Sequence, residues 1–316
     1  MSELSKFPTA LENRQLRSLG WVRAKEWIVK SGLLSATAFS VLITLSIVLL
    51  LLSETRTFFQ FDEVSVKDFL TGTEWTPKLG GVKQFGIWPL VSGTMLIATI
   101  AMIVALPLGL VTAIFLSEYA PRRLRNILKP VLEVLAGVPT VVYGFFALTF
   151  ITPFLKNIVG IDVNHFNALS AGIAVGILCI PTVSSLSEDA LQAVPRRLRE
   201  AAYGLGGTKF DVALKVVVPA ALSGIISAFL LAIARAVGET MIVAVAAGMT
   251  AKLTLDPRED IQTMTGFITA TAGGDLTNFD VTYFAIYAVA FTLFFMTLAV
   301  TLVGNLIRAR FQETYE

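Results

Sequence analysis

The segment Glu200-Ala201-Ala202-Tyr203-Gly204-Leu205-Gly206 is the most informative part of the sequence. It lies in a polar, basic stretch, residues 192–219, between two long apolar runs. This stretch ends in Val216-Val217-Val218-Pro219. The spacing predicts a short helix, a break at Gly206, a second short helix, and Pro219 in the first turn of the next membrane helix. We expect the loop 192–219 to be a docking element in the cytoplasm.

Composition places the chain among polytopic α-helical membrane proteins. Of its 316 residues, 55% are apolar and only 15% are charged, and the apolar residues gather in runs. Six runs approach or exceed the roughly 20 residues that a helix needs to cross a bilayer. They are 33–52, 88–117, 127–154, 168–190, 219–247 and 283–306. We therefore predict an all-α membrane protein with six transmembrane helices.

The basic residues predict the orientation of these helices. Seventeen Lys and Arg residues lie before the first run, after the last run, and in the loops that follow the second and fourth runs, against seven in the remaining loops. Loops rich in Lys and Arg stay in the cytoplasm, so we expect both termini there. The predicted organisation is a basic N-terminal segment (1–32), a transmembrane domain (33–307) with an external loop (53–87), and a cytoplasmic tail (308–316).

Two segments outside the runs leave alternatives open. Trp21 and Trp27 lie among basic residues, which fits either an interfacial helix or a solvated tail that only sets topology. The external loop 53–87 mixes acidic and aromatic residues, which fits either a partner surface or a small packed cap. In the fourth run, Gly172-x-x-x-Gly176 predicts close packing against another helix.

Arg235, Glu239 and Thr240 are polar residues within the fifth run. Arg235 falls about 24 Å along a helix that begins at Pro219, at a depth where a charge costs about 2.5–3.5 kcal/mol. Arg235 and Glu239 are four residues apart, so on one helix they share a face and can pair.

Two interpretations of these polar residues are open. In the first, Arg235 offers its donors to a passing tetrahedral oxyanion. Glu239 then neutralises Arg235 between passages, and Thr240 is a neutral donor on the same turn. In the second, Arg235 and Glu239 form a structural pair that holds helices together.

No motif indicates catalysis. The chain lacks the Gly-x-x-x-x-Gly-Lys-Ser/Thr loop that binds ATP phosphates. It contains one histidine and one cysteine, too few for a histidine or thiolate metal cluster. We therefore expect no metal, no cofactor and no enzymatic activity in this chain.

The segment Glu200-Ala201-Ala202-x3-Gly206, followed by Val216-x-Val218-Pro219, resembles the EAA-x3-G-x9-I-x-L-P signature of bacterial ABC-importer permeases. Valine stands where isoleucine and leucine are usual. In that family this loop forms coupling helices that insert into a groove of the ATP-hydrolysing subunit. The resemblance therefore assigns the contact to the following residues: Glu200, Ala201, Ala202, Gly206 and Pro219. It also implies the type I ABC importer permease fold and a bacterial inner membrane.

Residues 33 to 310 further resemble the phosphate-specific permeases of the PstC type. The segments that carry this resemblance are 68–70, 75–77, 107–109, 116–121, 129–146 and 235–241. The Arg-Ala-x-Gly-Glu-Thr block beginning at Arg235 is shared with the partner permease type, PstA, whereas Met241 and Trp75-Thr76-Pro77 look more like PstC. The family's intramembrane Arg and Glu are implicated in phosphate passage, which carries over to Arg235 and Glu239.

The same resemblance implies the partners. The chain would form half of a phosphate pathway with a second permease (PstA-like) and sit on an ATPase dimer (PstB-like). It would receive phosphate from an external binding protein (PstS-like) and bind no nucleic acid. Three alternatives remain: a permease for another oxyanion such as sulfate or molybdate, an ion-gradient-driven carrier, and a membrane sensor that does not transport. The carrier predicts inverted repeats that the sequence does not show, and the sensor leaves Arg235 and Glu239 without a role.

Overall fold

The computed structural model describes residues 10–77, 83–274 and 280–310, with side chains described from Trp21 onward except at residue 24. The chain divides into two compact units, Met1–Ser53 and Glu54–Glu316. Throughout the described ranges the regular elements are helices, apart from one isolated antiparallel bridge between Trp75 and Phe85.

The first unit is formed by α1 (Ala10–Phe58), which continues into the second unit. Its segment Trp21–Phe58 is long and apolar enough to span a membrane. Trp21 and Trp27 belong to this same helix, and the choice between an interfacial and a solvated position for them stays a prediction. The Lys25 ammonium lies 5.7 Å from the centroid of the Trp21 ring. The first residues of the predicted basic segment, Lys6 among them, lie outside the described residues.

The second unit supplies the remaining spans. Four continuous segments are long and apolar enough: Trp88–Tyr119 (α3 with the π-helical turn η1), Thr140–Val159 (α5, η2, α6 and η3), Ala168–Ala193 (α7) and Val281–Arg310 (α14). Two further helical segments, Lys209–Ala220 and Leu222–Val237, are long and apolar enough to span a membrane only when they are counted together, and a 71° bend separates them. The described residues thus hold five candidate spans, or six with the bent pair counted as one.

The predicted third run, 127–154, is wrong in its boundaries. It merges α4 (Arg122–Ala136) with α5 (Thr140–Phe146), which are separated at Gly137–Pro139. Pro139 lacks an N–H and disfavours helical backbone in the residue before it. No residue of α4 is buried, and most of its apolar side chains, such as Val134, are exposed. An amphipathic surface helix therefore adds its hydropathy to that of the true span, which runs from Thr140 to Val159.

The predicted fifth run, 219–247, is also wrong as one helix. Its central helix, α11, covers only Leu222–Val237, and α12 (Met241–Ala246) follows after a break at Gly238. Pro219 lies in α10 (Val218–Ala220), before the bend rather than in the first turn of α11. The π-helical turn η4 (Ala213–Val217) directly precedes α10, and a widened turn accommodates a residue that cannot complete the i→i−4 ladder.

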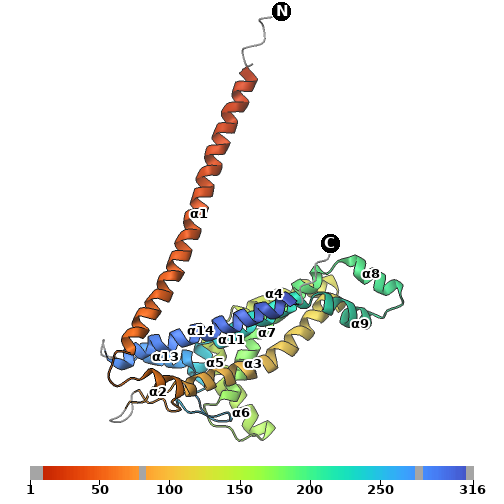
Figure 1. Ribbon diagram of the computed structural model, residues 1–316. Coiled ribbons are helices and arrows are strands. Elements are labelled where there is room, and N and C mark those ends of the chain that lie inside the picture. The colour runs from red at the N-terminus through yellow and green to blue at the C-terminus, as the bar shows by residue number, and fades with distance from the viewer. Residues whose placement is uncertain (1–9, 78–82, 275–279, 311–316) are drawn as a thin grey trace, which may run out of the picture. The chain divides into compact units, whose positions relative to one another are not determined.

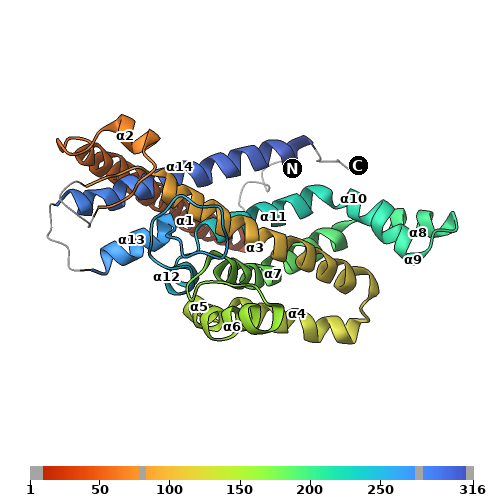
Figure 2. The same cartoon turned by 90° about the horizontal axis from the view of Figure 1, so that it is seen from below.

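Helices α3 and α7 form the centre of the second unit and pack closely (Figures 1 and 2). The predicted role of Gly172 and Gly176 is confirmed. A Cβ atom on Gly172 would lie 2.7 Å from the Ile100 Cβ, and one on Gly176 would lie 2.8 Å from the Val104 Cβ. Gly109 of α3 makes the reciprocal approach, 2.6 Å from the Val183 Cβ. Side chains at these glycines would separate the two helices.

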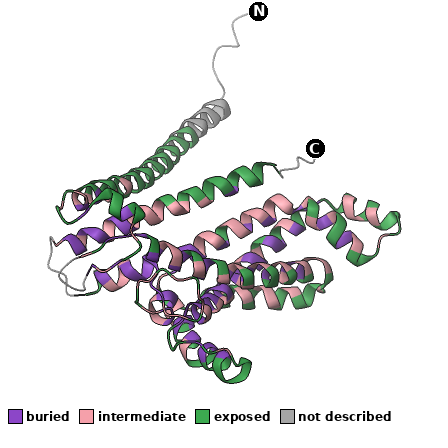
Figure 3. Ribbon diagram, turned by 60° about the horizontal axis from the view of Figure 1, so that its bottom comes forward, coloured by how far each residue is buried: buried purple, intermediate pink, exposed green. Residues whose placement is uncertain are grey.

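The described residues of the predicted external loop 53–87 fold into a packed cap, as one of the two alternatives expected, and a role as a partner surface stays a prediction. Its helix α2 (Val66–Thr71) and the Trp75–Phe85 bridge close over α13 (Met264–Ala272) and the start of α14. The Trp75 ring makes edge-to-face contacts with Phe69, Phe85 and Phe267. Buried residues gather in this region, whereas the C-terminal half of α14 is largely exposed (Figure 3).

The functional candidates lie at one end and near the middle of this unit. α8 (Arg196–Gly204) and α9 (Lys209–Val212) project at the end opposite the cap (Figures 1 and 2). We call these the α8 end and the cap end.

Candidate functional site

The loop 192–219 contains the predicted pair of short helices. Gly206 has φ +84°, a left-handed conformation in which a Cβ is strained, so glycine separates α8 from α9. Thr208 caps α9 because its hydroxyl accepts a hydrogen bond from the Asp211 N–H at 3.2 Å. The prediction of two helices around a break at Gly206 is confirmed.

The tip of this pair exposes apolar side chains. Leu205 is 90% exposed and Phe210 is 63% exposed, and Tyr203 is exposed beside them. Of the predicted contact residues, Glu200 and Ala201 are exposed, whereas Ala202 packs on the cluster around Leu191, Val194 and Val212. Pro219 lies beyond α9 and η4 along the chain, away from the α8–α9 turn. The α8–α9 tip therefore presents an apolar and polar surface suited to a protein partner.

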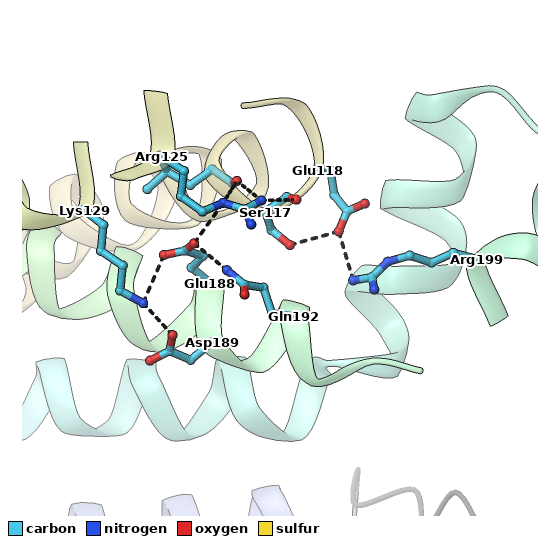
Figure 4. A network of polar contacts seen from close by, with 9 residues as sticks. Ser117, Glu118, Arg125, Lys129, Glu188, Asp189, Gln192 and Arg199 are labelled. Carbon is cyan, nitrogen blue, oxygen red and sulfur yellow. Dashed lines mark hydrogen bonds and ion pairs between the residues drawn. The ribbon is translucent and has the colours of Figure 1, made fainter. Parts of the chain in front are cut away.

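The base of α8 is fixed by charged side chains that the sequence does not single out. Arg199 donates from Nη2 to the Glu118 carboxylate at 3.1 Å and to the Leu191 carbonyl at 2.7 Å, and from Nη1 to the Val194 carbonyl at 3.0 Å. Ser117 donates to the same Glu118 oxygen at 2.9 Å (Figure 4). This network ties α8 to the ends of α3 and α7.

A second cluster lies beside it around Glu188, whose side chain is fully buried in α7. Gln192 donates to Glu188 Oε1 at 2.6 Å, and Arg125 and Lys129 of α4 each approach the carboxylate to 3.4 Å (Figure 4). Lys129 also pairs with Asp189 at 2.7 Å, and this hydrogen bond raises the pKa of Lys129 above its usual value. A buried carboxylate is stable here because two cations surround it.

A cavity of about 380 Å³ opens between these clusters and α8. Its lining is entirely polar or aromatic and comprises Ser117, Glu118, Arg125, Gln192, Arg196, Arg199, Glu200 and Tyr203. Glu200 of the predicted contact thus shares a cavity with the buried charge network.

Arg235 lies in the last turn of α11, half-buried and directed at α7. Its Nη1 donates to the Thr182 hydroxyl at 2.9 Å. Thr182 is therefore a partner that sequence reasoning missed, because nothing in the pattern of either helix shows that the two positions meet. The guanidinium retains further donors, since arginine has five N–H groups.

Glu239 does not form the ion pair with Arg235 that their spacing of four residues allowed. Among the described residues neither group forms a salt bridge with the other, because the helix ends at Val237 and Glu239 turns away. Glu239 is buried, and its Oε1 accepts hydrogen bonds from the N–H groups of Met241 at 3.1 Å and Ile242 at 3.2 Å. The carboxylate thus caps the N-terminus of α12, where the helix dipole favours a negative charge.

Thr240 likewise bonds to the backbone between α11 and α12 and not to Arg235. Its hydroxyl donates to the Gly238 carbonyl at 3.2 Å, and the Glu239 carbonyl accepts a 2.7 Å hydrogen bond from Thr265. Within the described part of the chain, Arg235 is consequently left with a neutral hydroxyl as its hydrogen-bond partner. A guanidinium whose donors are not occupied by a carboxylate can offer them to an anion.

Known proteins place the chain in a family. Residues 105–313 match the family model described as "Binding-protein-dependent transport system inner membrane component". The chain is 35% identical to the probable ABC transporter permease protein YqgH of Bacillus subtilis over 263 residues, which are 83% of each chain. It is 33% identical to the phosphate transport system permease protein PstC of Xylella fastidiosa, over 90% of this chain and 91% of that protein.

A solved structure of similar fold is a chain of a bacterial alginate ABC transporter in complex with an alginate pentasaccharide-bound periplasmic protein. It has a TM-score of 0.65 and 13% identity, and the match covers 93% of this chain and 98% of that one. The fold expected from the sequence, that of a type I ABC importer permease, is confirmed. The chain is therefore a multi-pass membrane protein that belongs to the family of binding-protein-dependent transport system inner membrane components.

Proposed function

We propose that this chain is a permease subunit of an ATP-driven, binding-protein-dependent phosphate importer. The substrate is suggested by relatives named as phosphate transport permeases, at 33% identity over nearly the whole length in one case. The chain carries no ATP-binding motif of its own. It needs a separate ATPase, a second permease such as the PstA type, and an external phosphate-binding protein.

The orientation follows from the basic residues. The α8 end carries Arg122, Arg123, Arg196, Arg197 and Arg199, so the positive-inside rule places it and both termini in the cytoplasm. The cap end then faces outward, toward the binding protein. The exposed tip residues Leu205 and Phe210, with Glu200 beside them, form the contact with the ATPase.

The observation that carries the transport proposal is the separation of Arg235 from Glu239. Because the backbone N–H groups of α12 engage the Glu239 carboxylate, that carboxylate does not occupy the hydrogen-bond donors of Arg235, which are left for a passing anion. Thr182 fixes the guanidinium through one nitrogen and leaves other N–H donors for phosphate oxygens. Single-point attraction of this kind speeds passage without trapping the anion, because the site offers one cation rather than a cage.

Coupling to ATP follows from the position of α8. Closure of the ATPase dimer moves the α8–α9 pair, the permeases open outward, and phosphate leaves its binding protein to pass Arg235. Hydrolysis resets the complex and releases phosphate inward. This is alternating access driven through one mechanical contact.

Uptake of labelled phosphate at low external concentration tests the proposal. Cells lacking the gene are compared with cells in which the wild type, Arg235→Gln or Arg258→Gln is restored. Arg258 is an exposed arginine in the loop before α13, paired with Asp256, and its variant controls for the lost charge. We expect uptake with the wild type and the control, blocked by arsenate but not by sulfate, and strongly reduced uptake with Arg235→Gln.

Uptake of sulfate or molybdate instead of phosphate would move the substrate to another oxyanion. Unimpaired transport by Arg235→Gln would remove Arg235 from the pathway.

A further inference from the structure

We propose that the turn Ser117-Glu118-Tyr119, at the end of α3, is the joint that carries movement of α8 and α9 into the membrane-spanning helices. This inference rests on the proposed contact between α8 and the ATPase. It assigns a role to a segment that the proposed function leaves unused.

Glu118 links the turn to α8. Its side chain is only 8% exposed and accepts hydrogen bonds from Arg199 at 3.1 Å and from Ser117 at 2.9 Å. The Arg199 side chain is 18% exposed and faces the bundle rather than the tip (Figure 4). Arg199 therefore acts through Glu118 as a positioning residue.

Tyr119 links the same turn to α9. The Lys209 ammonium lies 5.4 Å from the centroid of the Tyr119 ring, within the range of a cation–π contact. Adjacent residues of one turn thus hold the two helices of the pair, one through an ion pair and one through a ring.

The segment Ser117–Tyr119 is also fixed to the helix bundle. Arg125 of α4 donates to the carbonyls of Leu116 and Ser117, and the Ala120 N–H closes the π-helical turn on the Phe115 carbonyl at 2.8 Å. Arg125 also approaches the buried Glu188 of α7 to 3.4 Å. The turn is thereby connected to α3, α4 and α7 as well as to α8.

Arg199 provides a second connection, because it donates to the carbonyls of Leu191 and Val194 at the end of α7. Displacement of α8 consequently pulls on the ends of both α3 and α7. If the α8–α9 pair only docked to a partner, its exposed tip residues would be sufficient. The bonds of Arg199 and Glu118 instead connect α8 to the bundle and can transmit its displacement.

The test uses the whole complex, with the second permease, the ATPase subunits and the binding protein, in liposomes. The measured quantity is phosphate transported per ATP hydrolysed. We expect Arg199→Gln and Glu118→Gln to lower this ratio by about tenfold or more, since tenfold is the smallest factor that loss of one hydrogen bond to a charged group amounts to. Arg199→Lys keeps the charge opposite Glu118 and should recover part of the ratio. Arg123→Gln, which removes an exposed charge at the same end, should leave it unchanged.

Three results would count against the joint or the substrate separately. A wild-type ratio in both Gln variants would overturn the joint. Loss of ATPase subunits from the purified complexes in step with transport would also overturn it, in favour of a role in assembly. A wild-type complex that moves no phosphate would overturn the proposed substrate, and the same ratio measured with sulfate or molybdate would then decide the joint.

Discussion

Replacement of Glu239 separates its capping role from any role as a counter-charge for Arg235. The carboxylate accepts hydrogen bonds from the N–H groups of Met241 and Ile242 and is buried. Glu239→Ala leaves both N–H groups without this acceptor, at about 1–3 kcal/mol for each group, so we expect a loss of about 2–6 kcal/mol in the free energy of unfolding. Glu239→Gln keeps an amide oxygen in place. Hydrogen bonds to a charged acceptor are roughly twice as strong as neutral ones, so this variant should lose about 1–2 kcal/mol.

The unfolding free energy of the purified chain is measured by titration with SDS in mixed micelles, followed by tryptophan fluorescence. The double variant Arg235→Gln/Glu239→Gln completes the cycle. Because Arg235 bonds to Thr182 and the Glu239 carboxylate to the backbone of α12, with no ion pair between the two, their effects should add to within about 0.5 kcal/mol. Equal damage from Ala and Gln at position 239 would refute the capping role. A coupling energy above about 1 kcal/mol would show that Arg235 and Glu239 act as a pair.

Three further predictions concern packing, the α8–α9 turn and pH. Gly176→Leu should lower the unfolding free energy by about 1–3 kcal/mol in the same titration, because Val104 leaves no room; Gly32→Leu, which meets open space, is the control. Gly206→Ala strains a left-handed residue by about 1–2 kcal/mol and should weaken retention of the ATPase in pull-downs, whereas Gly204→Ala should not. The raised pKa of Lys129 stabilises the fold fully below pH 10.5, its usual value, and this contribution is lost as pH rises through the higher folded value. Lys129→Gln should therefore reduce the loss of stability on titration to alkaline pH, measured by SDS unfolding, and an unchanged profile would contradict this.

Properties that depend on composition and short-range spacing were predictable. The membrane character follows from the apolar runs. Gly172 and Gly176 pack closely because two small residues four apart line one face of any helix. Gly206 separates two helices because its backbone conformation is local. Each of these is decided within a few residues of the chain.

The wrong predictions concern burial and side-chain pairing, which depend on segments far apart in the sequence. Hydropathy sums the apolar residues of α4 and α5 without showing that α4 lies on the surface with Val134 exposed. The i,i+4 pairing of Arg235 and Glu239 assumed a continuous helix, but α11 ends at Val237. Glu188 carried a signal that was available, an acidic residue inside a predicted span. Its cationic partners on α4 come from about sixty residues earlier in the chain and cannot be identified from spacing.

The glycine seam between α3 and α7 limits how the protein can move. Gly109, Gly172 and Gly176 bring the two helices so close that the side chains opposite them interlock. Sliding one helix past the other would drive Ile100 or Val183 into the backbone of the opposite helix, so α3 and α7 move as one rigid body. The helical ladder is interrupted elsewhere, at the 71° bend before α11 and after Val237. Arg235 lies on α11 between these two interruptions and is bonded to Thr182 of α7, so the position of its guanidinium is set by the rigid α3–α7 pair rather than by α12.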